Sequence, residues 1–212
     1  MDPAWLFEHF GAAFLAVAAV IIFTECAIFP VLPGDSLLFA AGMFVAQRDG
    51  IRLFGLDETG TLLLALLILL VAAVLGNVVG YWVGMRVSPW LFKPRPGWVG
   101  RIFSRKHLAD AHAFFERYGA KALVLGRFVP FVRTFVTMVA GAAGMTFRHF
   151  ITWTGVGAVA WAVGVTLLGF FLGNIALIRD NLEVALILIV VVSVVPMVVE
   201  VWRERRKGAA RA

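Results

Sequence analysis

Cysteine and charged residues are both scarce in this sequence of 212 residues. Charged residues make up 15% of the chain, against about 25% in soluble domains, and hydrophobic residues make up 61%, against roughly 45–50%. The mean hydropathy of +0.92 agrees. This composition excludes a water-soluble globule and predicts an integral membrane protein with a single domain.

The single cysteine, Cys26, excludes a disulfide framework and a cysteine-based zinc site. The four histidines show no spacing typical of a metal site. We therefore predict no metal and no cofactor. The net charge of +6 does not indicate a nucleic-acid partner, because the basic residues lie in the gaps between apolar runs.

Apolar runs long enough to enter or cross a membrane, at roughly 20 residues per span, make up most of the chain. They cover residues 11–42, 61–85, 122–147, 150–178 and 184–199. Only the first and third runs contain charged residues, namely Glu25 and Asp35 in the first and Arg127 and Arg133 in the third.

Prolines interrupt the same two runs. Pro30 and Pro33, followed by Gly34, lie within the first run, and Pro130 lies within the third. Proline removes a backbone donor and clashes with the preceding helical turn, and unpaired backbone is not tolerated against lipid. We therefore predict two re-entrant helical hairpins, with ordinary proline kinks as the alternative.

The two interrupted runs resemble each other. Ala-Ala-Gly-Met occurs at 40–43 and again at 142–145, and a glycine-spaced helix at 80–84 has a counterpart at 169–173. The shared order predicts an all-α membrane protein built from a duplicated unit, as in transporters with inverted repeats. The expected parts are repeat 1 at about 11–86, a cytoplasmic linker at about 87–119, repeat 2 at about 120–178, a transmembrane helix at about 183–202 and a basic tail at 203–212.

The charge of the loops predicts the orientation. Residues 86–121 contain eight Lys or Arg and two acids, and the tail from Arg203 adds five basic residues, so both are expected in the cytoplasm. The balanced segment 47–60 suits the outer face. The first hairpin then enters from outside and the second from the cytoplasm, which is an inverted topology. Residues 104–118 fit either an amphipathic helix on the membrane surface or a solvated linker helix.

Four charged side chains inside the apolar runs mark the candidate site. Each costs on the order of 2.5–3.5 kcal/mol at the bilayer centre, so each must pair, be hydrated or have a function. The acids lie around the first break and the arginines around the second, so hairpins that meet would bring them together. Arginine offers a bidentate fork for phosphate oxygens, and helix N-termini add positive potential. We predict phosphate binding by the arginines and proton coupling by the acids. Two buried ion pairs that lock the hairpins are the structural alternative.

Glycines and tryptophans in the uncharged helices have simpler explanations. The glycines allow close helix packing; they are Gly76, Gly80, Gly84, Gly157, Gly164 and Gly169. Trp153 and Trp161 are expected to be interfacial anchors or packing residues.

Two motifs carry a family resemblance that covers nearly the whole chain. Residues 25–36, ECAIFPVLPGDS, are similar to a glutamate followed by P-x-x-P-G-[DE]. Residues 127–141 match the pattern R-F-x-P-x-x-R-T-x₅-A-G, with Met145 following. On these motifs the chain resembles the DedA family, within the wider superfamily of VTT or SNARE-associated-domain membrane proteins.

The resemblance implies a multi-pass protein of the bacterial cytoplasmic membrane with two re-entrant hairpins and a cytoplasmic C-terminus. Some members are implicated in returning undecaprenyl phosphate across the membrane, and related eukaryotic proteins act as phospholipid scramblases. The family's essential acids and arginines fall on the four intramembrane charges. The expected substrate site therefore comprises Glu25, Asp35, Arg127 and Arg133, together with the motif residues Pro30, Pro33, Gly34, Pro130 and Thr134.

The preferred function is a flippase that carries a lipid phosphate, with undecaprenyl phosphate as first candidate, while the lipid tail stays in the bilayer. The alternatives are a proton- or sodium-coupled carrier of small ions or drugs, a phospholipid scramblase, and a structural role for the charges. A lipid phosphatase is not expected, since P-S-G-H is absent and Ser104-Arg105 lies at the wrong spacing from His112. We predict no enzyme activity and no catalytic residue, and leave open a homo-oligomer.

Overall fold

The computed structural model of the chain describes residues 13–29, 32–47, 50–91, 123–124, 126–128 and 132–174. These residues form helices and no strand, so the all-α class is confirmed for this part. The helices are α2 (Phe14–Ala27), α3 (Gly34–Ala46), α4 (Glu58–Leu91), α8 (Val132–Ala142), α9 (Phe147–Ala158) and α10 (Gly164–Gly173), with a 3₁₀ turn η2 (Gly126–Phe128) and a π-helical turn η3 (Val159–Val163). Most of the predicted linker 87–119, the predicted helices at 104–118 and 183–202, and the basic tail lie outside the described residues.

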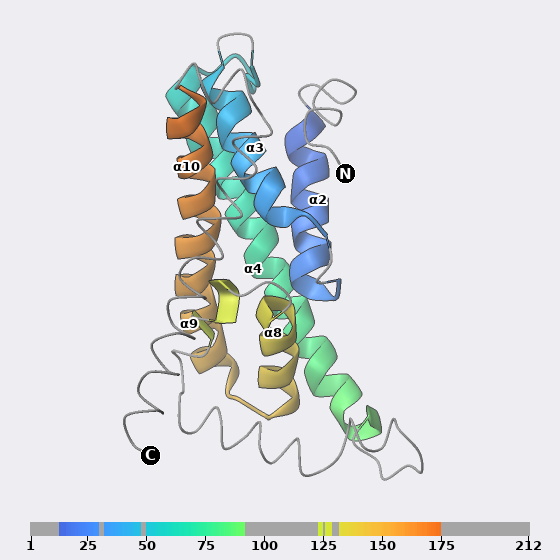
Figure 1. Cartoon of the computed structure of the whole chain (residues 1–212). Helices are drawn as coiled ribbons and strands as arrows, with labels where there is room; N and C mark the ends of the chain where they lie inside the picture. Colours follow the sequence, from blue (N-terminus) through green and yellow to red (C-terminus); the bar gives the residue numbers. More distant parts are fainter. Residues whose placement is uncertain are drawn as a thin grey trace, which may run out of the picture.

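Two long rods form the frame of the molecule. One is α4, and the other is the continuous rod made by α9, η3 and α10. Within them, Glu58–Ser88 and Phe147–Gly173 are long and apolar enough to cross a membrane. Figure 1 shows that the rods extend over the height of the helical bundle in opposite directions. They correspond to the uncharged runs predicted at 61–85 and 150–178.

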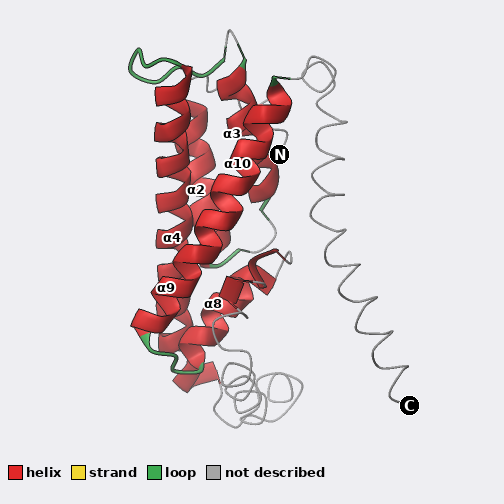
Figure 2. Cartoon of the chain, turned by 90° about the vertical axis from the view of Figure 1, so that its left-hand side faces the viewer, coloured by secondary structure: helices red, strands yellow, loops and turns green. Residues whose placement is uncertain are grey.

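Three shorter helices pack against this frame. With 14, 13 and 11 residues, α2, α3 and α8 are too short to cross a bilayer alone, which takes roughly 20. In Figure 1, α2 and α3 form an antiparallel pair in the upper half, whereas α8 starts near mid-height and descends. Figure 2 shows the same division from the side. The re-entrant position of these segments in a membrane stays a prediction.

The first close helix contact joins α3 to α10, which are far apart in the sequence. Gly42 of α3 lies against the backbone carbonyl of Thr166, and Gly169 of α10 lies against the carbonyl of Phe39. A Cβ atom at either glycine would collide with that carbonyl. The backbones therefore approach as closely as glycine permits, as predicted for Gly169.

The second close contact joins α8 to α4 in the same manner. Gly84 of α4 lies against the carbonyl of Met138, and Gly141 of α8 lies against the carbonyl of Tyr81. The predicted packing role is thus confirmed for Gly84. It is wrong for Gly164 within the described part of the chain, because no atom there lies within 4 Å of the place that its Cβ would occupy.

The repeated Ala-Ala-Gly-Met sequences do not have the same role in the structure. Gly42 is a packing residue inside α3. Gly144 instead follows the end of α8 with φ of 68°, and its N–H donates to the carbonyl of Gly141 at 3.1 Å. That left-handed turn favours glycine for conformational reasons rather than for packing. The residue that packs as Gly42 does is Gly141.

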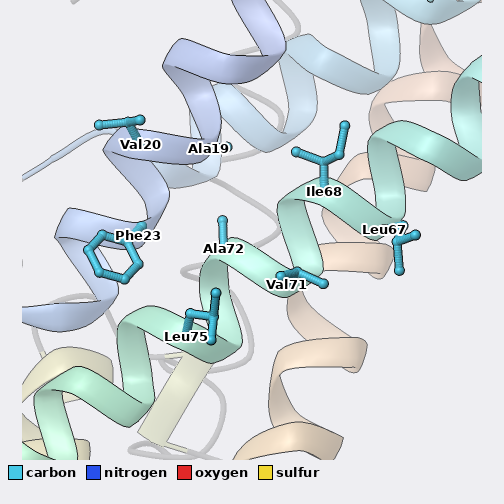
Figure 3. A pocket seen from close by; sticks show the side chains of 8 residues that line it. All are labelled: Ala19, Val20, Phe23, Leu67, Ile68, Val71, Ala72 and Leu75. Atoms are coloured by element: carbon cyan, nitrogen blue, oxygen red, sulfur yellow. The ribbon is translucent and has the colours of Figure 1, made fainter.

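An apolar groove lies between α2 and α4 (Figure 3). It is lined by Ala19, Val20, Phe23, Leu67, Ile68, Val71, Ala72 and Leu75. Because no lining side chain is charged or polar, this groove is distinct from the predicted anion site.

Substituting Gly42 by alanine is expected to destabilise the fold by about 1–3 kcal/mol, since the added methyl group must displace the backbone of α10. Gly155→Ala is the matched control, because its Cβ would meet nothing within 4 Å. The control should be neutral or stabilising by up to about 1 kcal/mol, the helix-propensity gain. Thermal unfolding of both purified variants in detergent measures the difference. Equal midpoints would contradict the close contact between α3 and α10.

Candidate functional site

The structure brings together residues from the ends of three short helices. Glu25 lies in the last turn of α2, Asp35 is the second residue of α3, and Arg133 is the second residue of α8. Both α3 and α8 begin near mid-height of the bundle (Figure 1). The site therefore forms where the two predicted breaks meet.

Arg133 connects the two acids. Its Nη1 donates to Asp35 Oδ1 at 2.8 Å, and its Nη2 donates to Glu25 Oε1. The Glu25 side chain is fully buried and Arg133 is 6% exposed, whereas Asp35 is 28% exposed. One guanidinium thus holds two carboxylates that belong to different helices, and Asp35 is the more accessible of the two.

Gly34 and Thr134 fix the position of Glu25. A Cβ atom at Gly34 would collide with Glu25 Oε2, so the absence of a side chain there makes room for the carboxylate. Thr134 Oγ1 donates to the Glu25 backbone carbonyl at 2.8 Å. Glu25 Oε2 is buried and has no hydrogen-bond partner within the described ranges. Gly34 and Thr134, two residues of the predicted site, therefore help to position Glu25.

Trp161 is part of the site, whereas the sequence predicts only an interfacial anchor or a packing residue. Its Nε1 donates to Asp35 Oδ1 at 2.6 Å. The Arg133 guanidinium carbon lies over its ring, 4.6 Å from the ring centroid. Trp161 is one of several tryptophans in apolar runs, and no local pattern distinguishes it. Only the contact across helices identifies it.

Arg127 is buried and takes part in neither of the two ion pairs of Arg133. It lies in η2 and is 3% exposed. In the part of the chain that the structure describes, no carboxylate forms an ion pair with it, and its Nη1 has no hydrogen-bond acceptor. A Cβ atom at Gly157 would lie 3.2 Å from Arg127 Nε, so α9 gives space to this side chain. Two ion pairs do join the helices, as in the structural alternative, but both use Arg133 and neither uses Arg127.

The remaining predicted residues are less informative. Pro33 directly precedes α3. Pro30 and Pro130 lie outside the described residues. Within the described ranges, no group of three or more His, Cys, Asp or Glu residues could hold a metal ion.

The cluster has the chemistry of an anion site. The N-termini of α3 and α8 lie at it, and helix N-termini carry partial positive charge. Arg133 stands in the first turn of α8, where the helix dipole disfavours a cation, and the two carboxylates offset this cost. Among the described residues, no acceptor is present for the buried N–H groups of Arg127 Nη1 and Arg133 Nε. An incoming anion could accept from either group.

Comparisons with known proteins give consistent results. A family model for the VTT domain matches residues 29–171. The chain is 38% identical over 213 residues to "Protein DedA" of Escherichia coli K12, covering 99% of this chain and 91% of that protein. It is 37% identical over 216 residues to an uncharacterized membrane protein of Mycobacterium leprae, covering 100% and 91% of the two chains. It is 33% identical over 186 residues to the inner membrane protein YqjA of Escherichia coli K12, covering 84% and 78%. No solved structure matches the chain significantly.

Proposed function

Because the chain belongs to the DedA family of VTT-domain membrane proteins, we propose that it is a multi-pass transporter that moves a lipid phosphate across a bacterial cytoplasmic membrane. The proposed cargo is undecaprenyl phosphate, carried from the outer to the inner leaflet, and the C-terminus is cytoplasmic. The observation that carries this proposal is that the buried guanidinium of Arg127 has no counter-ion among the described residues, whereas both acids pair with Arg133.

A phosphate head would supply what the site lacks. A buried cation without a counter-ion is costly, so an anion that provides acceptors for Arg127 would be stabilised there. The guanidinium fork matches phosphate oxygens. Helix N-termini at breaks in membrane helices commonly face anionic substrate groups, and α3 and α8 both begin at the cluster. The lipid tail would remain in the bilayer.

The charge balance supports ion coupling. With both acids ionised, the formal charges of the two acids and the two arginines cancel, so entry of a phosphate would leave excess negative charge. Uptake of a proton, or of sodium, by a carboxylate would offset it. Asp35 is the candidate carboxylate, because it is 28% exposed while Glu25 is fully buried.

We also propose that the two halves are inverted repeats, as alternating access requires. The contact between Gly42 and Thr166 has an equivalent between Gly141 and Tyr81. The residue number increases by 99 from Gly42 to Gly141, and it decreases by 85 from Thr166 to Tyr81. The same two shifts relate the contact of Gly169 with Phe39 to that of Gly84 with Met138. A repeated contact with constant shifts supports a pseudo-twofold axis through the cluster.

Transport by the purified wild-type protein in proteoliposomes tests the function. We expect the phosphate head of undecaprenyl phosphate to become protected from an external probe much faster than in protein-free vesicles, and faster still with a proton gradient directed along transport. Inorganic phosphate should not enter.

Other outcomes would assign other functions. Uptake of inorganic phosphate without protection of the lipid head would indicate a small-anion carrier. Equally fast, gradient-independent movement of phospholipids without phosphate monoesters would indicate a scramblase. No movement of any of these, with and without a gradient, would contradict transport and favour a structural role for the charges.

A further inference from the structure

The geometry points to Trp161 as a positioning residue of the anion site, held by the π-helical turn η3 so that its indole fixes both Asp35 and Arg133. This inference rests on the proposed function, whose substrate binds the same arginine. Trp161 lies outside both family motifs described above.

Two different parts of the indole act on two different residues. The Nε1–H group donates to Asp35 Oδ1 at 2.6 Å, and the same oxygen accepts from Arg133 Nη1 at 2.8 Å. The ring face supports the guanidinium at 4.6 Å. Trp161 is 3% exposed, so these interactions are shielded from water. Asp35 is the least enclosed member of the cluster and depends on this second donor for its position.

The helix that carries Trp161 contacts both arginines. Gly157 lies four residues earlier, on the same face of the rod, and leaves space for Arg127. Thr154, three residues before Gly157, shares this face and has a fully buried hydroxyl without a hydrogen-bond partner within the described ranges. The π-helical turn Val159–Val163 lies at the same place. Such turns are rare and are often found at functional sites.

The geometry of the stacking explains why tryptophan is useful here. Arginine donates hydrogen bonds from its edge, whereas the ring contacts its face. An anion can therefore replace Asp35 at Nη1 without breaking the contact with the ring. Trp161 therefore keeps Arg133 in position while the anion replaces Asp35. Its Nε1–H group also holds the released Asp35 nearby.

Substitutions separate this role from simple packing. Trp161→Phe keeps an aromatic ring but removes the N–H donor, and Trp161→Leu removes both. A hydrogen bond to a charged group corresponds to about a tenfold effect or more, so transport should fall about tenfold in the phenylalanine variant and further in the leucine variant. A packing role predicts that phenylalanine is nearly neutral. Trp153→Phe is the matched control, since Trp153 is 37% exposed and contacts His149.

A spectroscopic readout tests the contact independently of transport. The full-length protein, labelled with 5-fluorotryptophan and placed in lipid nanodiscs, gives a fluorine NMR resonance for Trp161 that is identified by its loss in Trp161→Phe. We expect Asp35→Asn and Arg133→Lys to shift this resonance and to leave that of Trp153 in place. Addition of undecaprenyl phosphate should also shift it.

The outcomes distinguish the inference from the function on which it rests. If the wild type moves no lipid phosphate but Asp35→Asn shifts the Trp161 resonance, the proposed function fails and the positioning role stands. If neither Asp35→Asn nor Arg133→Lys shifts the resonance, the inference is overturned. The same follows if Trp161→Phe transports at the wild-type rate.

Discussion

Replacing Arg133 by alanine is expected to abolish transport and also to destabilise the fold by about 3–5 kcal/mol, the cost of removing one partner from a buried ion pair. The physical reason is that Glu25 has no access to water and would be left without its cation. Asp35 would lose its ion pair as well. Protection of the lipid head in proteoliposomes measures the first effect, and thermal unfolding in detergent measures the second.

A double variant separates stability from function. Glu25→Gln with Arg133→Met replaces the charged pair by neutral side chains of similar length, and such replacements of buried pairs are often neutral or stabilising by about 1–4 kcal/mol. We expect the double variant to recover most of the lost stability but no transport. Transport by this variant would show that the ion pair is only a lock between α2 and α8.

Replacing Arg127 by methionine is expected to have the opposite effect on stability. Arg127 is a buried charge without a counter-ion in the part of the chain that the structure describes, so its removal should leave the fold as stable or make it more stable by about 1 kcal/mol or more. Transport should nevertheless fall at least about a hundredfold, which corresponds to about 2.7 kcal/mol of lost binding to a buried charged group.

Arg148→Met is the matched control, because Arg148 is an exposed arginine of α9. It should change stability by less than about 0.5 kcal/mol and leave transport intact. Addition of the lipid phosphate should raise the unfolding temperature of the wild type and of this control, but not that of Arg127→Met, because only a bound ligand stabilises the folded state. Destabilisation of Arg127→Met as large as that of Arg133→Ala would mean that Arg127 has a counter-charge.

These opposite signs arise from an unequal division of charge. If each arginine bound one acid, Arg133→Ala and Arg127→Met would both destabilise the fold, and both ion pairs would serve only to hold the helices together. Instead both acids bind Arg133, so one arginine holds the helices together and the other is available. In the function that we propose, the unpaired cation receives the anion, and the accessible Asp35 releases Arg133 when the anion binds.

Much of this architecture could be predicted from the sequence. The membrane class follows from composition, and the two long helices follow from uncharged runs, because both depend on local residue content alone. The end of α2 at Ala27, the start of α3 at Gly34 and the start of α8 at Val132 follow from proline chemistry. The four charged residues could be identified individually, because any charge in an apolar run is costly and therefore informative.

The tertiary structure alone decided which of these residues interact. Glu25 and Arg133 are 108 positions apart, and no local pattern states that Arg133 rather than Arg127 receives both acids. The sequence also does not reveal that Gly141, rather than Gly144, packs as Gly42 does. This depends on which carbonyl each helix presents to its neighbour. Trp161 belongs to the site because it lies in a π-helical turn and contacts Asp35 and Arg133 on other helices. Composition and spacing act along the chain, whereas ion pairing, stacking and close backbone approach depend on distances in space.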